Sequence, residues 1–454
     1  MSEKIDMVSQ PKESFWKLSI PIMAFCIFDS IYGIVDMAWV SQISVEASFA
    51  MGVSIPLVTL IFAFGDSIGQ GTNSIMSRFM GADDYESAYN ALIHGIIFAN
   101  IIWVLIIILL VFTPGKLFDM DSNHTYLLVL DYLIPIISFV YVFIFVNVFA
   151  ETLQAEGNSR IPAVLMISSN ILNIILDPIF IFNFNMGIKG AAYATVLTSA
   201  IPFVFFLFLY LSGRTKVPLS LKYFKFRPYI LYEIFKVTLP NFLDNGLWAF
   251  TATFINGILL VTLGEIGPVL YSTSNKIRGL LVSPIKGYGR ALMSVTGHLF
   301  GAQSFDELSE MFKYTLKISL ITSVLLVTAF MILRNPSFNF FSIIGYDSQI
   351  FNIGIFGIII MLSAPISMMA SKMLDGFGKS MYSLVFNCAK IGCTMIFIQI
   401  LYMVLNKGIS VLIGITLAEL VFAIAYYLFL RYLLKNFDKK YKNKDTVKKF
   451  SSTA

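Results

Sequence analysis

Stretches of about twenty consecutive apolar residues recur from one end of this 454-residue chain to the other. Because a helix rises about 1.5 Å per residue, roughly twenty such residues cross the ~30 Å hydrocarbon core of a bilayer. A helix also satisfies every backbone polar group within its own segment, which the bilayer interior requires. The chain is 57% hydrophobic and only 13% charged, against about 25% charged in soluble domains. These stretches therefore predict an all-α polytopic membrane protein.

Twelve of the stretches are long enough to span a membrane. The predicted spans lie at roughly 17–41, 49–79, 91–112, 126–150, 160–182, 187–212, 233–262, 266–299, 312–333, 348–372, 380–404 and 409–434. The longest hydrophilic break, 212–228, falls at the middle of the chain. We therefore expect two pseudo-symmetric six-helix bundles, an N-terminal lobe over 1–211 and a C-terminal lobe over 229–434. The basic segment 212–228 is the expected linker, and 435–454 is a basic tail.

The basic residues predict the orientation of the chain. With the N-terminus inside, 23 lysines and arginines fall on the inner side, and the outer loops hold only Lys116, Lys189, Arg334 and Lys407. Cytoplasmic loops carry such an excess, and an odd number of spans would have removed it. We expect a multi-pass protein of the plasma membrane with both termini in the cytoplasm. Met1–Lys17 is interpreted as a cytoplasmic lead-in and not as a cleaved signal peptide.

The net charge and the positions of the cysteines bear on possible nucleic-acid partners, disulfides and metal sites. The net charge of +5 follows mostly from the inner bias and from the tail, which would lie against anionic membrane lipids. It gives no reason to expect a nucleic-acid partner. The three cysteines, Cys26, Cys388 and Cys393, all lie inside predicted spans. We expect them to be buried apolar side chains, and neither a disulfide nor a metal site.

The two halves carry similar sequences at matching positions. Gly81-Ala82 ends the second span and Gly301-Ala302 ends the eighth, and an acidic inner loop follows each. Segment 153–160 after the fourth span likewise resembles 374–380 after the tenth. Glycine pairs also occur as ordinary turn chemistry, but two pairs at matching offsets favour a repeat. Six spans separate the members of each pair, so the halves share one orientation. Repeats of this kind place a substrate cavity between halves that rock against each other.

Carboxylates inside predicted spans are candidates for function, because one at the bilayer centre costs about 2.5–3.5 kcal/mol or more. Asp29 and Asp36 lie seven residues apart in the first span and so share one helical face. Asp29 is nearer the inner end and is a candidate cavity-lining residue. Asp66, in the second span, either lines the cavity or bonds to a neighbouring helix.

The fifth span carries three polar residues on one face: Asn170, Asn173 and Asp177. Pro178 has no N–H, so the carbonyl of Ile174 loses its helical partner. That carbonyl and the side chains of Asn173 and Asp177 offer an oxygen cluster that suits a sodium ion, or a proton shared between carboxylates. Thr195 and Thr198 place two hydroxyls on one face of the sixth span. The alternative is that these polar groups only bond helices together.

The eighth span carries four basic residues: Lys276, Arg278, Lys286 and Arg290. Three of them, Lys276, Lys286 and Arg290, lie within about 80° of arc and form one stripe. Candidate partners in the C-terminal lobe are chiefly Asp244 and Glu419. Either these acids and phospholipid headgroups neutralise the stripe, or the stripe lines an electropositive cavity. The second case would favour anionic or zwitterionic cargo.

These motifs together resemble the multidrug and toxic compound extrusion (MATE) family, over about residues 15–435. The matching segments are Val35-Asp36, Gly81-Ala82, Gly301-Ala302, the 154–160 loop and Asn173-Ile174-Ile175-Leu176-Asp177-Pro178. The resemblance implies a MATE-like fold of twelve helices in two lobes. It also implies export of organic cations or amphiphiles in exchange for protons or sodium, with no cofactor beyond the coupling ion.

Within that family, acids in the first and fifth spans resemble the DinF-type branch. The resemblance implies a proton or sodium site in the N-terminal lobe, made of Asp36, Asn173, Asp177 and Thr195. NorM-type members have a glutamate in the seventh span and an aspartate in the tenth. Here Trp248 stands at the first position, and 348–372 contains no acid. Family members bend at a proline in the first helix, which makes Pro21 a candidate hinge, although an ordinary helix-start proline explains it equally well.

Other function classes remain as alternatives. An intramembrane prenyltransferase would need two Asp-rich motifs, but Asp83-Asp84 has no second copy, which disfavours an enzyme. No Walker lysine motif is present, which excludes nucleotide-driven transport by this chain alone. The main rival is a flippase or exporter of lipid-linked or anionic amphiphilic cargo, from the same superfamily. The basic eighth span favours this rival and the Asn173–Asp177 cluster disfavours it. The sequence leaves the small-molecule substrate unidentified, and we expect a monomer.

Overall fold

This computed structural model describes residues 6–112, 124–219, 224–264, 266–340, 345, 347–405 and 409–441, which form helices and turns without a strand. The N-terminal helices are α1 (Pro11–Ser41), α2 (Val45–Gly81), α3 (Tyr85–Phe112), α4 (His124–Ser138), α5 (Val140–Ala155), α6 (Arg160–Pro178), the π-helical turn η1 (Ile179–Asn183) and α7 (Ile188–Leu211). The C-terminal helices are α8 (Pro228–Leu263), α9 (Ile266–Gly301), α10 (Phe305–Phe340), α11 (Asp347–Gly376), α12 (Ser380–Leu405) and α13 (Ile409–Tyr441).

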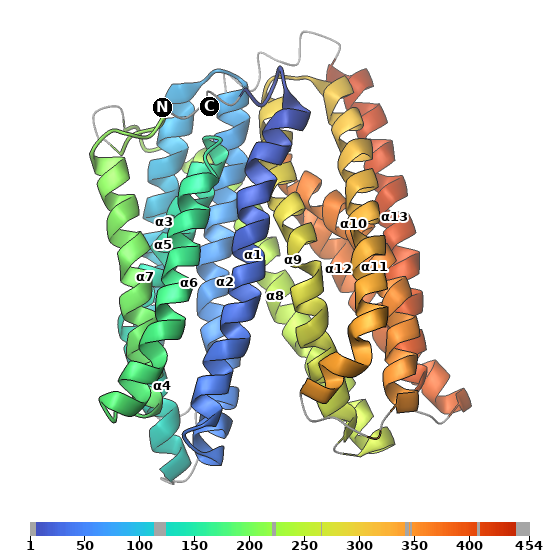
Figure 1. Ribbon diagram of the computed structural model, residues 1–454. Coiled ribbons are helices and arrows are strands. Elements are labelled where there is room, and N and C mark those ends of the chain that lie inside the picture. Colours follow the sequence, from blue (N-terminus) through green and yellow to red (C-terminus); the bar gives the residue numbers. More distant parts are fainter. Residues whose placement is uncertain are drawn as a thin grey trace.

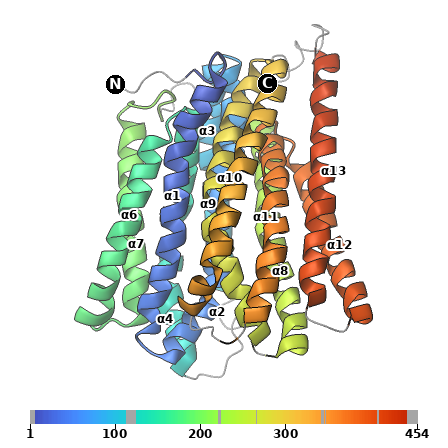
Figure 2. The same cartoon turned by 45° about the vertical axis from the view of Figure 1, so that its right-hand side comes forward.

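The helices gather into two bundles, α1 to α7 and α8 to α13, blue to green and yellow to red in Figure 1. The view in Figure 2, turned by 45°, shows the long helices running along one common direction. α1 begins and α13 ends at the same end of the molecule. We call this the inner end, because the predicted orientation makes it cytoplasmic, and we call the opposite end the outer end.

Described helices that are long and apolar enough to cross a membrane match up to eleven of the twelve predicted spans. Among the described residues, ten helices are long and apolar enough to cross a membrane, and α4 with α5 makes a further span that is bent by 51°. The predicted fourth span, 126–150, is therefore present as a bent pair of helices. Pro135 lies one turn before the bend and removes a backbone donor there. α9, which carries the four basic residues, occupies the predicted eighth span but is not among these apolar helices.

Turns of the same conformation end the corresponding helices of the two halves. Asp83 (φ 57°) and Gln303 (φ 60°) both adopt left-handed conformations after their Gly-Ala pairs. In each turn the next residue donates its N–H to the carbonyl five residues earlier, at 2.9 Å. Gly157 (φ 88°) and Gly378 (φ 70°) do the same in the second pair, at 2.8 Å. These are one type of helix C-cap used four times, which supports the repeat.

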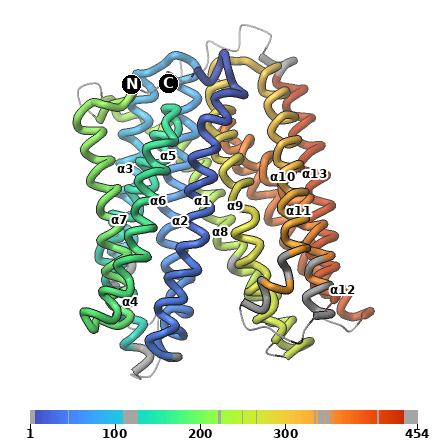
Figure 3. Tube along the Cα trace, viewed as in Figure 1, coloured from blue at the N-terminus to red at the C-terminus, as the bar shows by residue number. Residues whose placement is uncertain are grey.

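The inner ends of α2 and α9 cross in direct backbone contact. A Cβ on Gly81 would overlap the carbonyl group of His298, and a Cβ on Gly301 would overlap that of Arg78. Beside the crossing, Arg78 pairs with Glu233 of α8 at 3.2 Å. The two lobes are thus joined at the inner end, whereas Figure 3 shows the traces of α1 and α2 separating from those of α8 and α9 toward the outer end.

A buried acid joins the α5–α6 loop to the linker. Glu156 is 3% exposed, and its carboxylate accepts the N–H groups of Lys216 at 2.8 Å and Val217 at 3.3 Å. Burial raises the pKa of Glu156 to about 7, although these two bonds act in the opposite direction. The start of the linker is therefore held against the N-terminal lobe.

The structure corrects one cysteine prediction and leaves a few others outside its range. Cys26 is buried and Cys393 is half-buried, but Cys388 is exposed. The expectation of burial was wrong for Cys388 because it lies on a face of α12 whose apolar neighbours, such as Val385, are exposed too. Other sequence predictions lie outside the described residues: the tail at 442–454, the linker at 220–223, Lys116 and Lys407.

Candidate coupling site in the N-terminal lobe

Two aspartates from different helices meet inside the N-terminal lobe. Asp36 of α1 is 6% exposed and Asp177 of α6 is 0% exposed. Their carboxyl groups lie within hydrogen-bonding reach of each other, and no described basic side chain acts on either. Oδ1 of Asp36 has no hydrogen-bond partner in the described part of the chain. An ionised carboxylate has no donor, so a bond between these two groups needs a proton on one of them.

Asn173 and Thr195 complete this cluster. The Asn173 amide, oriented so that both of its ends are satisfied, donates to Asp177 Oδ2 at 2.9 Å and accepts from the Thr195 N–H at 3.1 Å. The Thr195 hydroxyl donates to the carbonyl of Ala191 at 3.0 Å and lies 3.5 Å from the Tyr32 hydroxyl. The structure therefore brings together all four residues that the resemblance assigned to one site, and their coupling role stays a prediction.

The helix that carries Asp177 changes its winding directly after that residue. α6 ends at Pro178, and the π-helical turn Ile179–Asn183 follows. Proline supplies no N–H to the helix, and π-helical turns occur mostly as single turns at functional sites. This change of winding lies where the sequence predicted a break in the hydrogen-bond ladder.

A cavity of about 320 Å³ adjoins the cluster. Most of the predicted site residues line it: Asp29, Asp66, Asn170, Asn173, Thr195, Thr198, Lys286 and Arg290. Asp36 and Asp177 are not among the lining residues, but Asp177 accepts a hydrogen bond from Asn173, which is one of them. Asn245 of α8 also lines the cavity, so helices of both lobes contribute to its wall. The aspartate pair therefore reaches the cavity through the Asn173 amide.

One residue of the basic stripe of α9, Arg290, forms ion pairs across the lobe boundary. Arg290 pairs with Asp66 of α2 at 2.6 Å and with Glu151 of α5 at 3.2 Å. The two candidate acids of the C-terminal lobe do not pair with Arg290. Asp244 accepts a bond from Asn387 at 2.9 Å and Glu419 pairs with Lys390 at 3.0 Å, so the two acids have partners within their own lobe.

The other two residues of the stripe differ from Arg290. Lys286 is exposed and lines the cavity. Lys276 is not among the lining residues, and its ammonium group lies 3.2 Å from the Met37 sulfur. The expected lining role of Lys276 is thus not seen at this cavity. Pro21 lies within the helical residues of α1, which continue unbroken from Pro11 to Ser41, and its hinge role stays a prediction.

Sequence reasoning missed a polar network between this cavity and the inner end. Asn73 of α2 donates to Glu151 at 2.9 Å and to Ser294 of α9 at 3.1 Å. Lys372 of α11 donates to Gln70 of α2 at 2.5 Å and pairs with Asp375 at 2.8 Å. The only signal in the sequence was a set of polar residues at the inner ends of apolar spans, which does not reveal their partners.

The donor set of the cluster fits a small hard ion or a proton. Carboxylate, amide and hydroxyl oxygens are ligands suited to hard cations, and Asp36 Oδ1, which has no partner among the described residues, is one oxygen available to such an ion. The described residues hold no group of three His, Cys, Asp or Glu side chains of the kind that binds a transition metal. Sodium and protons therefore both remain compatible with the site.

Comparison with known proteins decides the family. The sequence profile described as MatE matches residues 21–179 and 249–401, which is more than half of the chain. The chain belongs to the MatE family. The matched ranges fall on both sides of the predicted linker, so both halves carry MatE sequence. This membership confirms the prediction of a membrane transporter that is not an enzyme.

The relatives agree with this placement. The multidrug export protein MepA of Staphylococcus haemolyticus (strain JCSC1435) is 30% identical over 270 residues, and MepA of Staphylococcus aureus (strain MRSA252) is 27% identical over 270 residues. Each match covers 57% of this chain and 58% of the relative, so the chain spans little more than half the length of these MatE relatives.

Solved structures match over nearly the whole chain. MATE in complex with MaD5 superposes with a TM-score of 0.91 at 27% identity, covering 97% of this chain and 100% of that one. An outward-facing multidrug resistance MATE transporter of the MOP superfamily gives 0.90 at 28%, covering 95% and 97%. A Pyrococcus furiosus MOP superfamily transporter gives 0.89 at 28%, covering 94% and 97%. The predicted MATE-like fold of this polytopic chain is confirmed.

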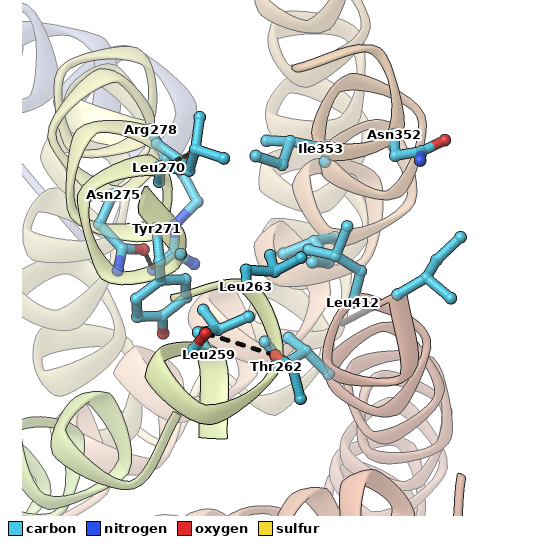
Figure 4. Close-up of a pocket in the computed structure, with 16 residues that line it drawn as sticks. Leu259, Thr262, Leu263, Leu270, Tyr271, Asn275, Arg278, Asn352, Ile353 and Leu412 are labelled. Atoms are coloured by element: carbon cyan, nitrogen blue, oxygen red, sulfur yellow. Dashed lines mark hydrogen bonds between the residues drawn. The ribbon is translucent and has the colours of Figure 1, made fainter. Parts of the chain in front are cut away.

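The MatE fold of this chain also encloses a cavity of about 470 Å³ in the C-terminal lobe. It lies between the outer halves of α8, α9, α11 and α13 (Figure 4). None of the residues assigned to the coupling site lines it.

Proposed function

We propose that this protein is a secondary-active exporter that exchanges organic cations or amphiphilic small molecules for protons or sodium ions. The observation that carries the proposal is the buried Asp36–Asp177 pair, which has no described counter-ion and adjoins a cavity through Asn173. Two carboxyl groups in contact cannot both ionise without a strong energetic penalty. The pair can therefore bind or release an ion as its surroundings change.

Such binding is useful for transport only if it depends on which side of the membrane the site faces. In this structure the lobes meet at the inner end, and the superposition on an outward-facing MATE transporter supports an outward-facing state. Alternating access would rock the two lobes about this contact. Loading Asp36 and Asp177 from outside would then favour release of cargo outward, and unloading inside would reset the protein.

The proposal also includes the branch of the family, the lobe boundaries, the orientation in the membrane and the oligomeric state. We place the chain in the DinF-type branch because its buried acids lie in the first and fifth spans. We retain the lobes at 1–211 and 229–434, cytoplasmic termini, a plasma-membrane location and a monomer. Drug-like cargo is supported by the similarity to multidrug export proteins. The positive-inside bias of the sequence supports the orientation.

The test is transport of a fluorescent organic cation into proteoliposomes under imposed gradients of protons, sodium and voltage, each applied alone. We expect the pH or the sodium gradient to drive uptake. We also expect a potassium–valinomycin potential alone to drive it, because two aspartates can hold more than one proton per cargo. One charge crossing 100 mV is worth about 2.3 kcal/mol. Uphill uptake after all three gradients are collapsed would contradict the proposal. No uptake under voltage alone would mean that one coupling ion is exchanged for one cargo cation.

A second candidate is export or flipping of lipid-linked or anionic amphiphilic cargo. It is favoured by Lys286, which lines the N-terminal cavity and makes no described ion pair. The four charged residues of that lining, Asp29, Asp66, Lys286 and Arg290, nevertheless sum to zero formal charge. The two candidates separate by competition, since an anionic amphiphile that blocks cation uptake only while Lys286 is present would favour this second candidate.

A further inference from the structure

The second cavity has an apolar wall with one cationic group. Its apolar lining comes from all four helices around it: Leu259, Leu263, Leu270, Ile353, Leu412 and Ile415. Figure 4 shows Arg278, Asn275 and Tyr271 of α9 on one side, and Ile353 and Leu412 across from them. At about 470 Å³, the cavity falls within the usual range of small-molecule sites, about 300–1,000 Å³.

The charge of this cavity is unbalanced. Nη2 of Arg278 donates to Oδ1 of Asn275 at 3.1 Å, and the described residues of the lining include no carboxylate. No described acid forms an ion pair with Arg278. A guanidinium group stays charged in proteins, and a cation in an apolar surrounding is costly unless an anion accompanies it. The described lining of the cavity therefore carries one positive charge that no carboxylate in it balances.

The pseudo-symmetry of the fold relates the helices around this cavity to helices of the first half. α8, α9, α11 and α13 hold the places in the second half that α1, α2, α4–α5 and α7 hold in the first. The N-terminal cavity is lined by α1, α2, α5 and α7 among others. Equivalent helices thus contribute to both cavities, although α6, α8 and α9 also line the first one. The N-terminal one has both acids and bases in its wall, and the C-terminal one has a single base.

We propose that the C-terminal cavity binds an amphiphile with one anionic group, such as a carboxylate, sulfate or phosphate. The anion lies on Arg278, whose planar group can donate two parallel hydrogen bonds to an oxyanion. The apolar tail lies against Leu259, Leu412 and Ile353. This site goes beyond the exchange proposed for the N-terminal lobe, and binding to it requires no ion gradient.

The test uses a long-chain fatty acid that carries a mid-chain diazirine, with its methyl ester as the uncharged counterpart. The full chain is reconstituted in phosphatidylcholine vesicles at about pH 8, irradiated and digested, and adducts are mapped by mass spectrometry. We expect the acid to label the residues around Leu259, Tyr271 and Leu412. Arg278→Gln should lower that labelling about tenfold, whereas Arg278→Lys should keep part of it.

Two further variants separate charge from shape. Arg214→Gln removes the same charge from an exposed inner position and should leave labelling unchanged. Leu412→Phe reduces the volume without touching the charge, and it should lower labelling by the acid and the ester alike. Equal labelling by acid and ester, unaffected by Arg278→Gln, would overturn the proposal. Adducts found only outside the cavity would overturn it too.

Competition identifies the source of the anion. Phosphatidylglycerol added to the vesicles displaces the probe if the natural occupant is a lipid headgroup. Dodecyl sulfate that competes while phosphatidylglycerol does not identifies a free amphiphilic anion. Either result supports the proposed chemistry, and failure of both to compete contradicts it.

Discussion

At the residue scale, Asp36 and Asp177 occupy a cluster of oxygen and amide groups into which no described cation reaches. The sequence identified each aspartate, because a carboxyl group within an apolar span is costly. Their contact could not be derived from spacing, since periodicity places residues on one helix and does not show which helices adjoin. Only the resemblance joined them before the structure was known.

Replacing either aspartate should stop exchange. Asp36→Asn and Asp177→Asn keep the size of the side chain but cannot cycle a charge, so we expect transport to fall to background while the protein remains folded and inserted. Asp66→Asn should be milder, because Asp66 pairs with Arg290. Asp131→Asn, in an exposed pair with Lys189 at 3.8 Å, is the matched control. Wild-type rates in either of the first two variants would refute the N-terminal site.

Arg290 should matter first for stability. Arg290→Gln leaves Glu151, which is 1% exposed, with the Asn73 amide but without its cation. Breaking a buried ion pair from one side costs about 3–5 kcal/mol, so the unfolding temperature should fall clearly. Adding Glu151→Gln should restore part of the loss. Lys189→Gln breaks an exposed pair and should change little; a loss as large as that of Arg290→Gln would contradict this view.

Glu156 should give stability a pH dependence. Its pKa is raised to about 7 in the folded protein, against about 4.3 in an unfolded chain. The folded state thus holds the proton more tightly, and the contribution of Glu156, present below pH 4, declines as pH rises through 7. Thermal unfolding at about pH 5 and pH 8 should show a smaller fall in Glu156→Gln than in the wild type. Glu86→Gln, at an exposed site, is the control, and identical falls in all three proteins would refute this assignment.

At the scale of elements, up to eleven of the twelve predicted spans are matched by described helices of sufficient apolar length, and the departures have local causes. The bend between α4 and α5 lies one turn after Pro135, and the π-helical turn lies directly after Pro178. Proline marked both places in the sequence, but its effect on helix direction depends on the neighbouring helices. The contact between α2 and α9 could not be predicted from the sequence for a similar reason. Gly81 and Gly301 are consistent with ordinary turn residues, and their positions in the sequence do not show that the two helices cross.

That crossing should control the balance between the two transport states. A methyl group on Gly301 would overlap the backbone of Arg78, so Gly301→Ala should weaken the inner contact. Spin labels on cysteines at Glu86 and Asp306, in a background lacking Cys26, Cys388 and Cys393, report the separation of the lobes. We expect longer distances in Gly301→Ala and no change in Gly392→Ala, whose Cβ would meet nothing within 4 Å. Identical distributions in both variants would contradict a closing role for the crossing.

At the scale of the whole molecule, the sequence predicted two repeated bundles and a cavity between them. It could not predict that Arg290 reaches Asp66 and Glu151 of the other lobe, because ion pairs between distant helices depend on the packed arrangement. This cross-lobe pairing places charged groups of both lobes in one cavity wall. Movement of the lobes would therefore alter the surroundings of the site, as an exchanger requires.

Ion movement driven by cargo tests the central claim most directly. Proteoliposomes containing a pH-sensitive dye, or a sodium-sensitive one, receive a fluorescent organic cation outside and no imposed ion gradient. The account predicts that cation uptake drives protons or sodium out of the lumen in the wild type, and that Asp177→Asn abolishes both movements. Cation uptake at the wild-type rate with neither ion moving, or with ion movement unchanged in Asp177→Asn, would contradict it.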